Sequence, residues 1–520
     1  MRIVGAFFRI VLAMLMTDEG VGLYQMAYPV YSLLLAVSTA GIPTAISKLV
    51  AENLAHGNYC GAYRIFQTAL ILLGLSGLII SVLLYQSAEY FAEVIFLDSR
   101  AYLPLISISP AIFFVTVMSA YRGFFQGQQQ MLPTALSQII EQLGRVIIGL
   151  FLVIYLLPKG LEYAAAAASF GAAAGALCGL LALIFIWWRQ RKKYMLKLKR
   201  QGKKNVHSFT RIMREILRIA VPITLGSLVM PLISIVDLAV VPLRLRAAGF
   251  LGNRATALYG QLAGMASPII HIPTIITVAL AISLVPAVSE ALALRKYSLL
   301  RQRAYQAIRM TLILAIPSAI GLYLLAEPIC VLLYQNAEAG AVLAVMALGV
   351  VFLTLYQTTS AVLQGLGHAM IPVTNLFWGA VVKTGFTWIL TAWPELNVRG
   401  AALATVLGFG TAALLNVYQL QKITDLHLAA VETIAKPLCA AGVMGIIVIY
   451  LYNTLEPTLL SLGITAANQI TTLLSVLVGA AVYFVSLMFL GGLYKSDLLL
   501  LPKIGAILVR IAERFHLIRG

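Results

Sequence analysis

The residues most able to do chemistry are charged and amide side chains inside long apolar stretches. Residues 132–156 carry Gln138, Glu141, Gln142 and Arg145 at spacings of i, i+3, i+4 and i+7. This spacing puts the four polar side chains on one face of a helix. An ionisable residue at the centre of a membrane-length apolar helix costs about 2.5–3.5 kcal/mol. We therefore expect this face to point at protein or at a cavity, not at lipid.

Three further apolar stretches carry such residues. The stretch 371–392 carries Asn375, Gly379 and Lys383 at i, i+4 and i+8. The stretch 3–16 begins after Arg2, which shares a helix face with Arg9. The stretch 216–242 contains Asp237. Glu141 and Arg145 could neutralise one another at i, i+4, and Arg2 could reach the cytoplasmic surface. Lys383 and Arg9 still lack an acidic partner within their own helix.

The intramembrane charges therefore favour an anionic ligand. Four cations, Arg2, Arg9, Arg145 and Lys383, face two carboxylates, Glu141 and Asp237, which leaves a surplus of two positive charges. A phosphate or pyrophosphate fits this surplus, because arginine forks bind phosphate oxygens bidentately and lysine supplies a point charge. We predict that these cations, with Gln138, Gln142 and Asn375, bind substrate.

Three residues are candidates for coupling or gating. Asp237 is the carboxylate available to a coupling cation, either a proton or sodium. Arg244 lies in a loop whose arginines either pair with nearby acids or form a release surface for an anionic headgroup. His271 either shuttles protons near neutral pH or is held by ordinary hydrogen bonds.

Composition identifies the chain as a membrane protein. Of its 520 residues, 61% are hydrophobic and 11% are charged, whereas soluble proteins carry about 25% charge. The net charge of +18 fits positively charged cytoplasmic loops and makes nucleic acid a poor candidate partner. The four cysteines are scattered without a CxxC motif, which excludes a disulfide framework or zinc module. We expect no metal and no cofactor.

The apolar runs predict an all-α polytopic membrane protein with about fourteen transmembrane helices. The first run is expected to be a retained helix, because no small-residue cleavage site follows it. The predicted spans are 3–16, 22–48, 65–85, 102–121, 132–156, 163–188, 216–242, 257–290, 305–326, 340–363, 371–392, 400–420, 434–453 and 467–492. Prolines and glycines interrupt the second, seventh and eighth of these spans, which makes those helices candidate gates.

The basic residues predict the orientation of the chain. Twelve lysines and arginines but one acid, Glu215, lie between Arg189 and Arg218, after the sixth span. Because loops rich in lysine and arginine stay in the cytoplasm, both termini are predicted to be cytoplasmic. The same stretch is expected to contact anionic membrane lipids. The tail 493–520 is predicted to form an amphipathic helix at the cytoplasmic surface.

Two stretches about 240 residues apart resemble one another. Gln126-Gly127, Pro133 and Arg145 precede one small-residue run, and Gln364-Gly365, Pro372 and Lys383 precede another. We interpret them as parallel repeats. The predicted domains are an N-terminal lobe of six helices (1–188), a basic linker (189–215), a C-terminal lobe of six helices (216–421), two extra helices (422–492) and the tail (493–520).

Three segments of the chain resemble a known family of exporters. The segments are DEGVGLYQMAYPVYSLLLAVSTAGIPTAISKLVAE (18–52), AYRGFFQGQQQMLPTALSQIIEQLGRVIIG (120–149) and TALYGQLAGMASPIIHIPTIITVALAISLVPAVSEA (256–291). They resemble the stage V sporulation protein B branch of the polysaccharide-biosynthesis exporters. That branch belongs to the superfamily of MATE multidrug transporters, O-antigen flippases and MurJ-type lipid II flippases.

The resemblance implies fourteen helices in two lobes around a central cavity, and alternating access in a bacterial cytoplasmic membrane. The implied substrates are undecaprenyl-pyrophosphate-linked saccharides for peptidoglycan or spore cortex. Arg2 and Arg9, which flank Gly5, resemble the paired cavity arginines of the first helix in the flippases. The cavity arginines of MurJ-type proteins late in helix two and early in helix eight are absent, and Arg145 and Lys383 are the cations present here.

Two other functions make different demands on the sequence. A cation-coupled multidrug exporter of the MATE type would favour intramembrane carboxylates over cations. A polytopic enzyme acting on lipid-linked sugars would need carboxylates or histidines on a sizeable aqueous loop. The predicted outer loops hold roughly 2–16 residues. We therefore predict a flippase and not an enzyme.

Overall fold

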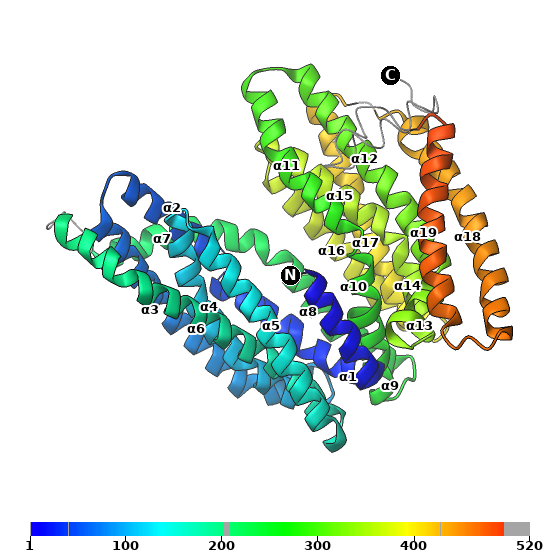
Figure 1. Cartoon of the computed structure of the whole chain (residues 1–520), viewed down its shortest axis with the longest axis horizontal. Coiled ribbons are helices and arrows are strands. Elements are labelled where there is room, and N and C mark those ends of the chain that lie inside the picture. The colour runs from blue at the N-terminus through cyan, green and yellow to red at the C-terminus, as the bar shows by residue number, and fades with distance from the viewer. Residues whose placement is uncertain (1, 40, 202–207, 427, 493–520) are drawn as a thin grey trace. The chain divides into compact units, whose positions relative to one another are not determined.

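The computed structural model describes residues 2–39, 41–201, 208–426 and 428–492, and the regular elements in those ranges are all helical (Figure 1). The helices form two compact units, Met1–Gly264 and Met265–Gly520. The predicted cytoplasmic tail and residues 202–207 of the predicted linker lie outside the described residues.

The first unit is built from long helices with short connections. Its helices are α1 (Arg2–Thr39), α2 (Ile42–Ala55), α3 (Tyr59–Tyr90), η1 (Phe91–Ile95), η2 (Ser99–Ala101), α4 (Tyr102–Gly127), α5 (Met131–Leu156), η3 (Leu157–Lys159), α6 (Leu161–Gln201), α7 (Phe209–Ser227), α8 (Val229–Ala247) and α9 (Gly252–Gly260). A π-helical stretch, η4 (Gln261–Ala266), crosses the boundary between the units.

The second unit is also helical. Its helices are α10 (Ser267–Ile270), α11 (Thr274–Ala293), α12 (Tyr297–Leu324), α13 (Ala326–Tyr334), α14 (Glu338–Ala347), α15 (Gly349–Gly365), α16 (Met370–Leu390), α17 (Asn397–Thr424), η5 (Val431–Ala435), α18 (Lys436–Ser461) and α19 (Ala467–Phe489).

Ten helical runs among the described residues are long and apolar enough to cross a membrane, or up to twelve if each of two bent pairs is one span. The bent pairs are α7 with α8, at 43°, and α14 with α15, at 42°. The predicted all-α polytopic fold is confirmed. The count of fourteen is higher because the first two predicted spans share the run Phe7–Ala55, and because α16 is not among these runs.

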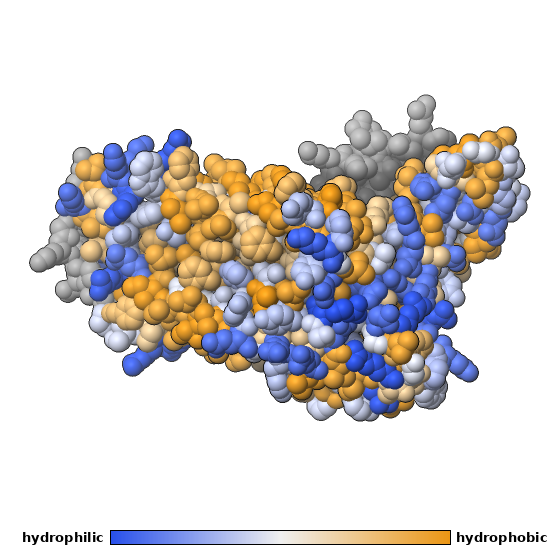
Figure 2. All heavy atoms as spheres, turned by 90° about the horizontal axis from the view of Figure 1, so that it is seen from below, coloured by the Kyte–Doolittle hydropathy of each residue, from blue (hydrophilic) through white to orange (hydrophobic). Residues whose placement is uncertain are grey.

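Large apolar side chains cover wide areas of the surface. Ile71, Leu75, Ile79 and Leu83 of α3 are each at least half exposed and recur every four residues, so they form a stripe along the helix. Figure 2 shows hydrophobic residues over much of the face it presents. Soluble proteins rarely expose such continuous apolar area, and lipid is the solvent that suits it.

Several predicted spans are broken inside. Thr17, at φ 60° and ψ −176°, interrupts α1 between the first and second predicted spans. Gly41 has φ 77°, and a Cβ atom there would lie 2.9 Å from the Ile223 Cβ atom of α7, so glycine suits both the backbone and the contact. The three spans predicted to bend are all divided into shorter helices, the seventh into α7 and α8 and the eighth into α9, η4, α10 and α11.

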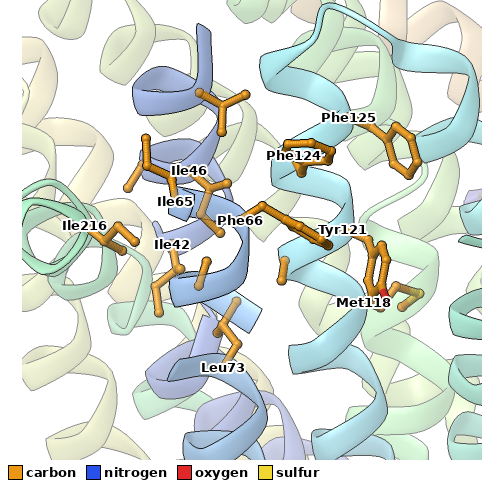
Figure 3. Packing of buried hydrophobic residues seen from close by; sticks show 14 of the residues in the cluster. Ile42, Ile46, Ile65, Phe66, Leu73, Met118, Tyr121, Phe124, Phe125 and Ile216 are labelled. Carbon is orange, nitrogen blue, oxygen red and sulfur yellow. The ribbon is translucent and has the colours of Figure 1, made fainter. Parts of the chain in front are cut away.

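An aromatic core joins α3, α4 and α6 in the first unit. The Phe66 and Phe124 rings stack with centroids 4.5 Å apart, and Figure 3 shows Phe66 and Tyr121 facing one another between α3 and α4. Trp187 and Tyr194 of α6 pack on the same Phe124 ring. These contacts hold α6 as one helix to Gln201, thirteen residues into the predicted linker.

The two units repeat one helix crossing. A Cβ atom at Gly127 would lie 2.7 Å from the Val50 Cβ atom, and a Cβ atom at Gly365 would lie 2.8 Å from the Val288 Cβ atom. Both pairs are related by 238 positions, as are Arg145 and Lys383. This shared contact supports the internal repeat. The domain boundaries stay a prediction, and α7 and α8, which were assigned to the second lobe, fall in the first compact unit.

Candidate functional site

The polar stripe of α5 faces protein on one side of that helix. Glu141 is buried, Arg145 is largely covered, and Gln142 is half-buried, whereas Gln138 is exposed. The opposite face carries Ile147, Phe151 and Ile154, whose side chains are 60–69% exposed. The helix therefore separates a lipid-facing apolar side from a covered polar side, because only the apolar side can meet hydrocarbon without an electrostatic cost.

Arg122 of α4, one residue beyond the predicted span 102–121, joins this stripe. Its Nη2 atom donates to Glu141 Oε2 at 2.8 Å, and its Nε atom donates to Ser137 Oγ at 3.0 Å. The contact between Arg145 Nη2 and Glu141 Oε1 is longer, at 3.8 Å. The signal in the sequence is that apolar residues continue after Arg122, so α4 extends to Gly127.

The small-residue run of α6 supports α5 directly beneath these charges. A Cβ atom at Gly175 would lie 2.8 Å from the Arg145 backbone nitrogen and would also collide with the Glu141 carbonyl oxygen. A Cβ atom at Gly179 would lie 3.1 Å from the Glu141 Cβ atom. Only glycine permits so close an approach of the two backbones, as is common between membrane helices. The repeat of glycines on α6 thus fixes the depth at which Glu141 and Arg145 lie.

A row of tyrosines on α1 lies beside Arg145. Tyr24, Tyr28 and Tyr31 occupy one helix face, with successive ring centroids 6.2 and 5.9 Å apart. Arg145 of α5 lies in the neighbourhood of all three tyrosines. From the other half of α1, Arg9 lies over the Tyr28 ring with its Cζ atom 5.8 Å from the centroid, within cation–π range.

These residues form a cationic site that we call the arginine–tyrosine cluster. Its members are Arg9, Tyr24, Tyr28, Tyr31, Arg122, Glu141 and Arg145. Three arginines and one glutamate leave two positive charges uncompensated within the cluster. The Arg145 Nε atom is buried and has no hydrogen-bond partner among the described residues. A buried donor of this kind is costly unless an acceptor reaches it, so the cluster is suited to an anion.

The second unit places its predicted residues on α16. Lys383 and Asn375 are both buried. Lys383 packs on Gly408 of α17, so closely that a Cβ atom added at Gly408 would lie 2.7 Å from the Lys383 Cβ atom. Asn375 Nδ2 donates to Asn416 Oδ1 at 2.9 Å, and Asn416 Nδ2 donates to Ser360 Oγ at 2.9 Å. Asn375 therefore belongs to a hydrogen-bonded amide network that ties α15, α16 and α17 together.

The remaining predicted residues are dispersed. Asp237 is half-buried on α8 and interacts electrostatically with Tyr259 of α9, and Arg244 is half-buried at the end of α8. His271 is exposed, and its Nδ1 atom lies 2.7 Å from the Ser267 carbonyl oxygen. The Arg2 side chain lies outside the described residues. In the described part of the chain, no three His, Cys, Asp or Glu side chains gather as a metal site.

Acidic residues gather in a second polar cluster of the first unit. Asp98 accepts hydrogen bonds from Arg100 Nη2 and from Thr256 Oγ1 of α9, both at 2.8 Å, and Arg100 also binds Glu19. Asp18 accepts a hydrogen bond from Gln261 Nε2 at 2.8 Å. Burial alone would raise the pKa of the Asp98 carboxyl, but the bonds from Arg100 and Thr256 outweigh burial, and its pKa is lowered.

Comparisons with known proteins agree with this architecture. A family model described as polysaccharide biosynthesis protein matches residues 1–292, and one described as MatE matches residues 222–389. The chain is 31% identical over 509 residues to stage V sporulation protein B of Bacillus subtilis (strain 168), covering 98% of this chain and 96% of that protein.

Two further matches concern lipid II flippases. The chain is 30% identical over 426 residues to lipid II flippase MurJ of Bacillus subtilis (strain 168), covering 78% of this chain and 77% of that protein. A solved structure of lipid II flippase MurJ in an inward closed conformation superposes with a TM-score of 0.69 at 17% identity, covering 93% of this chain and 95% of that chain. The structural match shows a shared fold.

Proposed function

We propose that this chain flips undecaprenyl-pyrophosphate-linked saccharides across the bacterial cytoplasmic membrane by alternating access. The chain belongs to the polysaccharide biosynthesis protein family and is a multi-pass membrane transporter. The substrates in this proposal are peptidoglycan or spore-cortex precursors such as lipid II. Lipid II flippase MurJ, a relative by sequence, supports this substrate class.

The excess positive charge of the arginine–tyrosine cluster is the observation that carries the proposal. A pyrophosphate group offers several oxygens to two guanidinium groups, Arg9 and Arg145, and arginine forks bind such oxygens bidentately. The buried Arg145 Nε donor would then find an acceptor. In a site with low dielectric constant, each such charge-assisted hydrogen bond contributes about 1.5–3 kcal/mol.

The sugar part of a lipid-linked saccharide also finds a matching surface. A sugar ring is proposed to pack on the face of Tyr28, which is half-buried next to Arg9, whereas Tyr24 and Tyr31 are buried in the protein.

Lys383 is the proposed substrate-binding cation of the second unit, with Asn375 holding α16 in place. Its position is 238 residues after Arg145, and in both units a glycine-bearing helix packs beneath the cation. A lysine buried on the covered face of an otherwise apolar helix supports a role in binding an anion.

We also propose that the cytoplasmic extension of α6 contacts anionic membrane lipids. Arg189, Arg191, Lys192, Lys193, Lys197 and Lys199 are all exposed there. Trp187 and Tyr194 fix the opposite face of the extension to the aromatic core, so the cations stay near the membrane. Each such cation near an anionic surface contributes about 1 kcal/mol. This placement supports the cytoplasmic location of both termini.

A cation-coupled multidrug exporter is the second candidate function. The observation that favours it is the match of residues 222–389 to the MatE model, together with half-buried Asp237 in that region. In either function, Asp237 is the proposed site for a coupling proton or sodium ion, and Arg244 and His271 are proposed to act in gating.

Reconstitution into vesicles tests the proposed function. Fluorescent undecaprenyl-pyrophosphate muropeptide is added, and the fraction reached by an impermeant quencher is followed for the full chain, Arg145→Ala and Lys383→Ala. Arg64→Ala, which removes an exposed arginine of α3, is the matched control. We expect each site variant to slow flipping about tenfold or more, which corresponds to one lost charge-assisted hydrogen bond.

Equal flipping by all four proteins would contradict the cationic site. Transport of a cationic dye in exchange for protons or sodium, without movement of the lipid, would favour the multidrug exporter instead.

A further inference from the structure

Glu141 lies at different distances from its two arginine neighbours. Its Oε2 atom accepts a direct hydrogen bond of 2.8 Å from Arg122, whereas its Oε1 atom is 3.8 Å from Arg145. The side chains of Arg122 and Arg145 are equally covered, each with 14% of their surface exposed, so burial does not explain the difference. Arg122 therefore takes the stronger interaction with the only acidic member of the arginine–tyrosine cluster.

Neighbouring residues hold Glu141 in contact with Arg122. Arg122 Nε donates to Ser137 Oγ, and Ser137 Oγ itself donates to the Thr134 carbonyl oxygen at 2.8 Å. Gly179 of α6 lies so close that a Cβ atom there would be 3.1 Å from both the Glu141 Cβ atom and the Ser137 carbonyl oxygen. The α6 backbone thus fixes the position of Glu141, and Ser137 fixes the position of the Arg122 guanidinium beside it.

Arg145 is left with unused binding capacity as a result. Its Nε atom is buried without a hydrogen-bond partner in the described part of the chain. If Arg122 were neutral, Arg145 would be the nearest cation to Glu141, one helical turn away on the same face. A carboxylate in a covered site pairs with the nearest cation, because an unpaired buried charge is costly.

We propose that Arg122 is a positioning residue that holds Glu141 at ion-pair distance from Arg145 and prevents a direct hydrogen bond between them, so that the Arg145 guanidinium keeps its donors for a pyrophosphate oxygen. The inference rests on the proposed function, because it concerns how the same site holds its anionic ligand. It assigns no ligand contact to Arg122 itself.

Binding of undecaprenyl pyrophosphate to the full chain in nanodiscs tests the inference. Four proteins are compared: the unaltered chain, Arg122→Gln, Arg122→Gln/Glu141→Gln and Glu141→Gln. Arg122→Gln lets Glu141 move from its 3.8 Å ion pair into a direct hydrogen bond with Arg145, and it is expected to raise the dissociation constant about tenfold. The double variant removes the competing carboxylate and is expected to return within about threefold of the unaltered chain. Glu141→Gln is expected to tighten binding, since it adds one net positive charge.

A role of Arg122 in folding alone would give a different pattern. The double variant would then bind no better than Arg122→Gln, or Arg122→Gln would bind as tightly as the unaltered chain, and either result overturns the inference. If Arg122→Gln does not fold, weaker binding by Glu141→Gln overturns it as well. Failure of the proposed function is distinguishable, because the unaltered chain itself would then not bind undecaprenyl pyrophosphate.

Discussion

Arg9 lies over the ring of Tyr28, with its Cζ atom 5.8 Å from the ring centroid, although nineteen residues separate the two along α1. In a straight helix those residues would be about 28 Å apart. The break at Thr17 bends α1 and so brings Arg9 to the Tyr28 ring. The two predicted spans at the N-terminus therefore build one side of the arginine–tyrosine cluster together.

The contact between Arg9 and Tyr28 predicts a role for the aromatic ring. Replacing Tyr28 by leucine removes the cation–π interaction, and we expect the apparent KM for the lipid-linked substrate to rise about threefold to fivefold. Tyr28→Phe keeps the ring and is the matched control. An unchanged KM in Tyr28→Leu, measured in the vesicle assay, would argue against a part for this ring in the site.

Gly175 predicts a requirement for close helix packing beneath the cluster. Gly175→Ala would press a methyl group against the α5 backbone near Arg145, and we expect the free energy of unfolding to fall by about 1–3 kcal/mol. Gly74→Ala on α3 is the control, because a Cβ atom there meets open space. Thermal unfolding in detergent measures both. Equal melting temperatures would show that α5 and α6 can separate without cost.

The amide network of the second unit predicts a stability effect that a double variant reverses in part. Asn416→Leu leaves the buried Asn375 and Ser360 polar groups without their partner, and we expect a loss of about 2–4 kcal/mol. Asn375→Leu/Asn416→Leu removes two of these polar groups together and is expected to be less destabilised than Asn416→Leu alone. Additive losses in thermal unfolding would contradict a coupled network.

The lowered pKa of Asp98 predicts a pH dependence. Because its folded pKa lies below the ordinary value of 3.8, the carboxylate stabilises the fold above about pH 3.8, and this contribution is lost as the pH falls through the folded pKa. We expect Asp98→Asn to lower the melting temperature at pH 7 and to lose less stability than the unaltered chain between pH 5 and pH 3. Thr256→Val, which removes one donor to Asp98, is expected to show a smaller effect at pH 7. Parallel pH profiles of Asp98→Asn and the unaltered chain would contradict the assignment.

The sequence by itself determined the membrane character, the helical class and the covered face of α5. Hydropathy and helical periodicity are properties of single segments, so they identify which side chains share a face, as they did for Glu141 and Arg145. The glycines and prolines also predicted where helices break, because those residues limit the backbone locally.

Only the tertiary structure decided which residues from different helices meet. Arg122 lies one residue beyond a predicted span but pairs with Glu141, Arg9 lies over the Tyr28 ring, and Asn375 bonds to Asn416. Periodicity contains no information on the depth and rotation at which two helices pack. Those are set by close contacts such as Gly175 against α5, which exist only once the helices have assembled.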